Sequence, residues 1–136
     1  MVAQSSAQEY ETRAGPARAR RVLIADDNRD LVLTLMVLLE DEGYEVQGVH
    51  SGTEVMPAMR SFNPDTVVLD IKMPGLNGFE VAKMIRKRYG EVRPLLIALS
   101  GHYKLGSDKV LTQIVGFNHH LAKPYDPQAL LALLRI

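Results

Sequence analysis

Charged and hydroxyl side chains follow four of the short apolar runs in this chain. Asp26 and Asp27 follow one run, and Asp70, Ser100 and Lys123 end or follow three others. Short runs rich in Val, Ile and Leu, bounded by turn residues, are typical of strands buried on both faces. Ligands of open α/β sheets bind outside the carboxyl ends of the strands, so these side chains are candidates for chemistry. We take Asp70 as the centre.

The residue types point to phosphoryl chemistry. Three carboxylates at one place repel each other and any phosphate, so an anionic substrate needs a hard cation there. Asp26 and Asp27 suit Mg²⁺ (or Mn²⁺), with Asp70 joining through one oxygen. The other Asp70 oxygen can attack phosphorus and form an aspartyl phosphate, while Lys123 and Ser100 neutralise the phosphoryl oxygens. Water hydrolyses that product, so we expect a self-resetting phosphoacceptor rather than an enzyme.

Each of these residues also has a simpler explanation when it is taken alone. Asp27 or Asn28 then only caps a helix, Ser100 only ends a strand, and Lys123 is a surface amine. Coincidence at four strand ends is a weaker explanation than one shared site.

Apolar spacing predicts five strands that alternate with five helices. The expected strands are 22–25, 44–50, the run from Pro64 to Asp70, 94–100 and 117–122. The expected helices run from Leu31 to Gly43, from Ser51 to Phe62, from Gly78 to Tyr89, from Leu105 to Val115 and from Gln128 to Ile136. This alternation implies a parallel sheet with helices on both faces, which brings the carboxyl ends of the strands to one edge.

Local signals refine these elements. Pro74-Gly75 suits a type II turn, and Asn77 with Glu80 resembles a capping box that opens a helix. Ser51 with Glu54 resembles a second capping box, and Pro57 predicts a kink or a late start for that helix. The helical pattern from Leu105 is broken by Gly106, so this helix is expected to be the least stable.

Composition excludes several classes of function. The 136 residues suit one domain, and residues 1–20, which have no apolar periodicity, are expected to form a disordered arm before a domain over 21–136. Sixteen basic and sixteen acidic residues leave no net charge to favour nucleic acid or an anionic membrane. The absence of cysteine excludes disulfides and thiolate catalysis. No apolar run approaches the roughly 18 residues of a membrane span, so we expect a cytoplasmic protein.

Four motifs together resemble the response-regulator receiver domain of two-component phosphorelays. They are Ile24-Ala25-Asp26-Asp27, Leu69-Asp70 with Met73-Pro74-Gly75 and Gly78, Ala98-Leu99-Ser100-Gly101, and Lys123-Pro124. The resemblance covers 21–136. It implies a flavodoxin-like, doubly wound (βα)5 sandwich with strand order 2-1-3-4-5 and a cis Lys-Pro bond.

The resemblance also implies a role for each site residue. These roles are Asp70 as phosphoacceptor, Asp26 and Asp27 as the metal pair, the Lys72 backbone carbonyl as a further ligand, Ser100 as switch hydroxyl and Lys123 as phosphate contact. The phosphoryl donor would be a histidine kinase or phosphotransfer protein. The phosphoryl group would pull Ser100 inward and shift the face made by the fourth helix, fifth strand and last helix, which contacts a downstream protein. We expect a monomer or weak homodimer.

Two positions depart from the usual pattern of the family. His120 stands where the family has Tyr or Phe, whose rotation follows the switch hydroxyl. Strand alternation puts His120 on the opposite face from Lys123, so it is either a switch residue or, with His119, a surface residue without a signalling role. Lys72 and His102 occupy positions that resemble sites tuning phosphate lifetime in the family, although a solvated lysine explains Lys72 equally simply.

Other proteins of this general architecture fit less well. A haloacid-dehalogenase-like phosphohydrolase needs a second Asp where Lys72 stands, and a flavodoxin-like carrier needs a phosphate loop where Asp26 and Asp27 would repel phosphate. A pseudo-receiver that binds partners without phosphorylation stays open. Residues 117–124 are similar to receivers of hybrid sensor kinases, so a receiver cut from a longer protein is the alternative to the stand-alone receiver that we expect.

Overall fold

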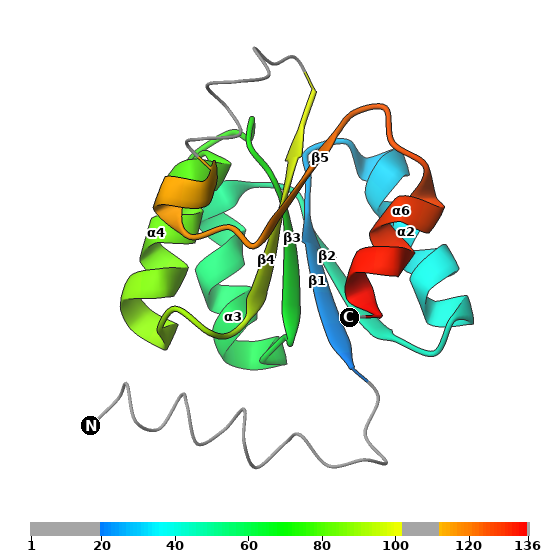
Figure 1. Cartoon of the computed structure of the whole chain (residues 1–136), viewed down its shortest axis with the longest axis horizontal. Helices are drawn as coiled ribbons and strands as arrows, with labels where there is room; N and C mark the ends of the chain where they lie inside the picture. Colours follow the sequence, from blue (N-terminus) through cyan, green and yellow to red (C-terminus); the bar gives the residue numbers. More distant parts are fainter. Residues whose placement is uncertain (1–19, 102–111, 136) are drawn as a thin grey trace.

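The computed structural model describes residues 20–101 and 112–135 and contains one parallel five-stranded sheet (Figure 1). The strands are β1 (Arg21–Ala25), β2 (Glu45–Val49), β3 (Thr66–Asp70), β4 (Leu95–Ser100) and β5 (His119–Ala122). Their order is β2-β1-β3-β4-β5, and every neighbouring pair is parallel. The predicted strand order and fold class are therefore confirmed.

Helices cover both faces of the sheet. They are α2 (Arg29–Asp41), the 3₁₀ turn η1 (Gly52–Glu54), α3 (Val55–Phe62), α4 (Gly78–Tyr89) and α6 (Pro127–Leu134), and residues 112–115 are also helical. In Figure 1, α3 and α4 lie on the left of the sheet, while α2 and α6 lie on the right. None of the helices within the described ranges is long and apolar enough to cross a membrane.

Two hydrophobic cores result from the alternation of side chains along the strands. Val67 and Leu69 of β3 belong to the core under α3 and α4, whereas Val68 belongs to the core under α2 and α6. Because every residue of β3 is buried, this central strand carries apolar side chains on both faces. Side chains alternate between the two faces up to the last residue of each strand. This alternation decides on which face of the sheet the side chain of a site residue lies.

The two predicted capping boxes have different outcomes. Asn77 caps α4 as predicted, since its Oδ1 accepts from the Glu80 N–H at 2.9 Å and Glu80 Oε1 accepts from the Asn77 N–H at 3.1 Å. The capping box predicted at Ser51 is wrong. The Ser51 hydroxyl donates a hydrogen bond to the Glu54 carboxylate and accepts none from a backbone N–H. The helix start is late, as Pro57 predicted, since η1 precedes α3.

Most elements differ from the prediction by one or two residues at their ends, and three of these shifts have a clear local cause or partner. β4 begins at Leu95, and α6 begins at Pro127 because Asp126 caps it by accepting the Gln128 N–H at 2.9 Å. β5 begins two residues late. The Asn118 side-chain oxygen there accepts the Leu96 N–H at 2.8 Å, in place of a backbone carbonyl.

Some predictions fall on residues outside the described ranges. They are the arm over 1–19, the site at His102, and the helix from Leu105 up to 111 with its break at Gly106. Arg20, which we assigned to the arm, is described, and its guanidinium donates to the Leu134 carbonyl at 2.8 Å.

Candidate functional site

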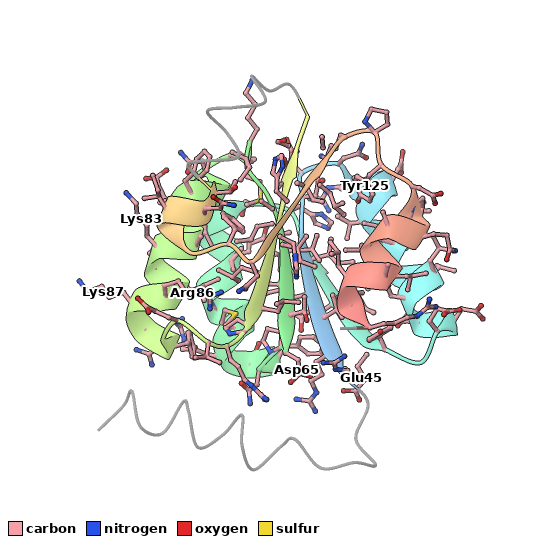
Figure 2. All side chains as sticks on the ribbon, in the orientation of Figure 1. Glu45, Asp65, Lys83, Arg86, Lys87 and Tyr125 are labelled. Carbon is pink, nitrogen blue, oxygen red and sulfur yellow. The ribbon has the colours of Figure 1, made fainter. Side chains whose placement is uncertain are left out.

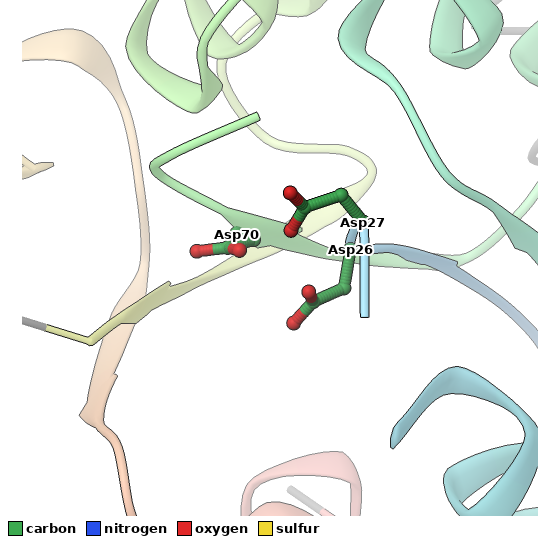
Figure 3. Close-up of side chains that lie close together, drawn as sticks. All are labelled: Asp26, Asp27 and Asp70. Atoms are coloured by element: carbon green, nitrogen blue, oxygen red, sulfur yellow. The ribbon is translucent and has the colours of Figure 1, made fainter. Parts of the chain in front are cut away.

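Three carboxylates meet at the carboxyl edge of the sheet. β1 and β3 are neighbours with Ala25 opposite Leu69, so the residues that follow these two emerge side by side. Oxygens of Asp26, Asp27 and Asp70 all lie within 4.8 Å of one another (Figure 3). Asp26 is completely buried, Asp70 is 4% exposed, and Asp27 is open to solvent. The sequence prediction that these residues converge is confirmed.

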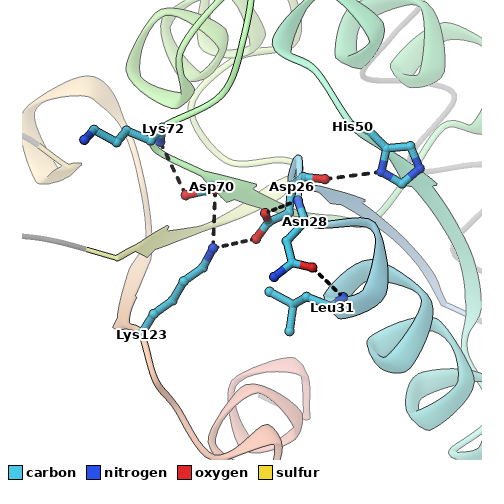
Figure 4. A network of polar contacts seen from close by, with 7 residues as sticks. All are labelled: Asp26, Asn28, Leu31, His50, Asp70, Lys72 and Lys123. Carbon is cyan, nitrogen blue, oxygen red and sulfur yellow. Dashed lines mark hydrogen bonds and ion pairs between the residues drawn. The ribbon is translucent and has the colours of Figure 1, made fainter.

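Lys123 reaches this cluster from the end of β5 (Figure 4). Its Nζ lies 2.7 Å from Asp26 Oδ2 and 3.3 Å from Asp70 Oδ2. The Lys123 N–H donates to the Ser100 carbonyl at 2.7 Å, which continues the pairing of β4 and β5 to the site. The Lys123–Pro124 bond is cis, as the resemblance implies.

Backbone N–H groups hold the second oxygen of each buried carboxylate. The Asn28 N–H donates to Asp26 Oδ1 at 2.9 Å, and the Lys72 N–H donates to Asp70 Oδ1 at 3.3 Å. Each carboxylate is thus fixed between one N–H and the Lys123 ammonium. Lys72 itself has an exposed side chain, and the role of its carbonyl as a metal ligand stays a prediction.

The cluster carries an excess of negative charge. Burial, and then the neighbouring charge of Asp26, raise the pKa of Asp70 to about 6 although Lys123 opposes the shift. Burial alone would lower the pKa of Lys123, but the hydrogen bond to Asp26 and the charges of Asp70 and Asp26 outweigh it and raise that pKa. Three carboxylates and one ammonium leave two excess negative charges when all are ionised.

The donor set fits a hard divalent cation. Mg²⁺ prefers oxygen ligands, and it typically uses one or two carboxylates with water and phosphate oxygens. Burial and then the charge of Asp26 raise the pKa of Asp70 despite Lys123, so a bound cation would favour the ionised carboxylate. Asp26, Asp27 and Asp70 would hold it.

The other two predicted residues form a separate pair beside this cluster. Ser100 is 3% exposed, and its Oγ lies 2.8 Å from Nε2 of the half-buried His120. Within residues 20–101 and 112–135, no hydrogen bond joins Ser100 Oγ to Asp70 or Lys123. His120 is therefore not an isolated surface residue.

Tyr125 lies beside the site and was not predicted from the sequence. Its buried hydroxyl has no hydrogen-bond partner among the described residues, and burial together with the charges of Asp26 and Asp70 raises its pKa to about 12. Tyr125 also lines an apolar pocket of about 370 Å³ between α2 and the start of α6. Its position just after the predicted Lys123-Pro124 strand end was the only available signal in the sequence.

Comparison with known proteins agrees with this arrangement. The family model described as the response regulator receiver domain matches residues 22–135. The chain is 38% identical over 114 residues to the CAI-1 autoinducer sensor kinase/phosphatase CqsS of Vibrio cholerae, covering 82% of this chain and 16% of that protein. It is 32% identical over 116 residues to the DNA-binding response regulator MtrA of Mycobacterium tuberculosis, covering 85% and 49%.

Solved structures of response regulators have the same fold as this chain. Chemotaxis response regulator CheY4 of Vibrio cholerae superimposes with a TM-score of 0.79 at 27% identity, covering 87% of this chain and 98% of that one. A putative response regulator from Chloroflexus aurantiacus gives 0.79 at 28% identity, with 87% and 96% covered. The chain spans about half or less of the length of the curated relatives above. On the match over residues 22–135 and this fold, the chain belongs to the response regulator receiver domain family.

Proposed function

We propose that this receiver domain is a phosphorylation-driven switch that accepts a phosphoryl group on Asp70 in a Mg²⁺-dependent reaction. Receiver domains are signalling domains that partner with histidine kinases or phosphotransfer proteins, and such a protein is the proposed donor. The observation that carries the proposal is the contact of Lys123 with both Asp26 and Asp70 inside the three-carboxylate cluster.

Asp70 is the best-placed nucleophile. It belongs to the central strand, is 4% exposed, and is held through both oxygens by the Lys72 N–H and Lys123 Nζ. With a pKa of about 6, it is mostly ionised at pH 7 even before a cation binds. A fixed, ionised carboxylate at an open sheet edge is ready to attack phosphorus.

The transfer moves one phosphoryl group and no electrons. An Asp70 oxygen forms a bond to phosphorus while the P–N bond of a phosphohistidine breaks, and the released imidazole takes the bonding pair and a proton from water. Bound Mg²⁺ would neutralise the phosphoryl oxygens during this step. Lys123 contributes a second positive charge next to the carboxylate pair. Hydrolysis of the acyl phosphate by water resets the site.

The output is proposed to run through protein contacts. The phosphoryl group would draw in the Ser100 hydroxyl and shift the face that includes β5 and α6, a population shift between two packings of the domain. The downstream partner is a protein, the domain is a monomer or weak homodimer, and it works in the cytoplasm with its donor. Lys72 and His102 are proposed to tune how long the phosphate lasts.

The test is the intact mass of the protein after incubation with a small acyl phosphate, with and without Mg²⁺. We expect a Mg²⁺-dependent gain of one phosphoryl group in the wild type and none in Asp70→Asn. The matched control is Asp65→Asn, which changes an aspartate at the amino end of the same strand, away from the cluster. No gain by a folded wild type that binds Mg²⁺ would favour the pseudo-receiver that binds partners without phosphorylation.

A further inference from the structure

Ser100 and His120 form a partly buried hydrogen bond beside the candidate site. Ser100 is the last residue of β4, and His120 lies inside β5, the neighbouring edge strand. The two atoms, Ser100 Oγ and His120 Nε2, lie 2.8 Å apart. This contact occupies the hydroxyl that the proposed switch assigns to the phosphoryl group.

Strand alternation places this pair on the face of the sheet opposite Asp70. Ala98 belongs to the core under α3 and α4, so Ser100, two residues later, points to the same face. His120 pairs with Ala98 across the parallel ladder and therefore shares that face. Asp70 shares the other face with Val68, which packs under α2 and α6.

The backbone that carries His120 is held in place by its neighbours. The register of β5 is fixed by the pairs from Ile97 with His119 to Ser100 with Ala122. Asn118, just before β5, is held to Leu96 by two hydrogen bonds of 2.8 Å, one from each of its backbone and side chain. Arg86 also donates to the Asn118 side chain at 2.9 Å.

Contact between Ser100 and a phosphoryl group on Asp70 therefore requires the Ser100–His120 bond to break. This holds for either tautomer of His120, because Oγ must leave its position beside Nε2 to reach a group on the opposite face of the sheet. We propose that His120 is a positioning residue that retains the Ser100 hydroxyl on the α3 and α4 face and thereby favours the unphosphorylated packing. The inference rests on the proposed function, since it concerns the switch that Asp70 would drive.

The chemistry of the side chain decides the expected effect of substitution. His120→Phe keeps a flat ring but removes the hydrogen-bonding nitrogen, so Ser100 loses its tether. His120→Gln keeps a polar group near the position of Nε2. The Ser100–His120 hydrogen bond favours the unphosphorylated packing and so lowers the population of the other packing. A ligand that binds only that other packing should therefore bind more tightly when the hydrogen bond is removed.

The experiment measures the affinity of the Mg²⁺-loaded protein for beryllofluoride, which mimics an acyl-bound phosphoryl group. We expect His120→Phe to bind beryllofluoride about fivefold more tightly than the wild type, a change that equals about 1 kcal/mol and matches one net hydrogen bond. His120→Gln is expected to stay within about twofold of the wild type, because its polar group can retain the hydroxyl. Urea unfolding of each variant checks that the domain is folded.

The decisive comparison is made in a protein that carries Ser100→Ala. With the hydroxyl removed there is no tether to lose, so His120→Phe in that background should leave the beryllofluoride affinity unchanged. Equal or weaker binding by His120→Phe alone would overturn the inference. Tighter binding that persists without the Ser100 hydroxyl would also overturn it, since His120 would then act through other contacts. If the folded wild type binds Mg²⁺ but no beryllofluoride, that result would instead contradict the proposed phosphorylation of Asp70.

Discussion

Lys123 lies closer to Asp26 than to Asp70, with Nζ–Oδ2 distances of 2.7 Å and 3.3 Å. The ammonium therefore neutralises the fully buried carboxylate of Asp26, just after β1, more than the candidate nucleophile at the end of β3. Asp70 retains a pKa of about 6, raised by burial and by the charge of Asp26. This imbalance gives the predictions below on stability and pH.

Asp70→Asn should stabilise the metal-free protein above pH 6. The folded-state pKa of Asp70 is raised from 3.8 to about 6, so ionisation of this group costs the folded state free energy once the pH passes through that range. Asparagine has no such cost, so the free energy of unfolding should exceed that of the wild type by up to about 3 kcal/mol at pH 7 and by little at pH 4. Urea unfolding across this pH range measures the difference, and a difference independent of pH would contradict the prediction.

Lys123→Met should destabilise the metal-free protein at pH 7. Removal of the ammonium leaves the buried Asp26 and Asp70 carboxylates without their counter-charge, which costs about 2–4 kcal/mol after allowance for the partial exposure of Lys123. The loss should shrink at pH 5, because Asp70 can then take up a proton. Lys72→Met is the matched control, since its side chain is exposed and its change should stay within about 0.5 kcal/mol. A loss that is as large at pH 5 as at pH 7 would argue against this electrostatic origin.

Asp27→Ala should separate metal binding from stability. Asp27 is exposed, so the metal-free free energy of unfolding should change by less than about 0.5 kcal/mol. Affinity for Mg²⁺, measured by calorimetry, should fall at least tenfold, because even indirect supports of a metal site are worth about 10- to 100-fold. Asp30→Ala, another exposed aspartate in the first turn of α2, should leave the Mg²⁺ affinity unchanged. Similar affinities for the two variants would exclude Asp27 as a ligand.

Arg86→Ala should weaken the attachment of β5 to the domain. Its guanidinium donates at 2.9 Å to the carbonyls of Gly116 and Pro94, in addition to its bond to Asn118, so three segments lose a common donor. We expect a loss of about 2–4 kcal/mol in the free energy of unfolding. Lys83→Ala is the control on the same helix, since Lys83 points away from the body of the protein (Figure 2) and should change stability by less than about 0.5 kcal/mol. Equal effects of the two substitutions would refute this role for Arg86.

Local sequence was sufficient to predict several individual elements. The apolar β-branched run ending at Asp70 predicts a strand buried on both faces, and β3 is fully buried. Asn77 and Glu80 predict their own cap because both partners lie within one turn of helix. The same reasoning failed at Ser51, where the hydroxyl turns to the Glu54 carboxylate instead of the backbone. Two local partners were available there, and sequence spacing does not choose between them.

Sequence alone was enough to predict that three carboxylates and one lysine converge. Parallel strands end at one edge, so the order of strands and polar residues already brings Asp26, Asp27, Asp70 and Lys123 together. Only the tertiary structure decided how they share their contacts, because distances and burial depend on neighbouring strands far apart in the chain. Lys123 favours Asp26, Asp70 keeps a raised pKa, and Ser100 is bonded to His120 on the opposite face of the sheet. These contacts depend on register and on side-chain conformation across strands, which no periodicity along one strand records.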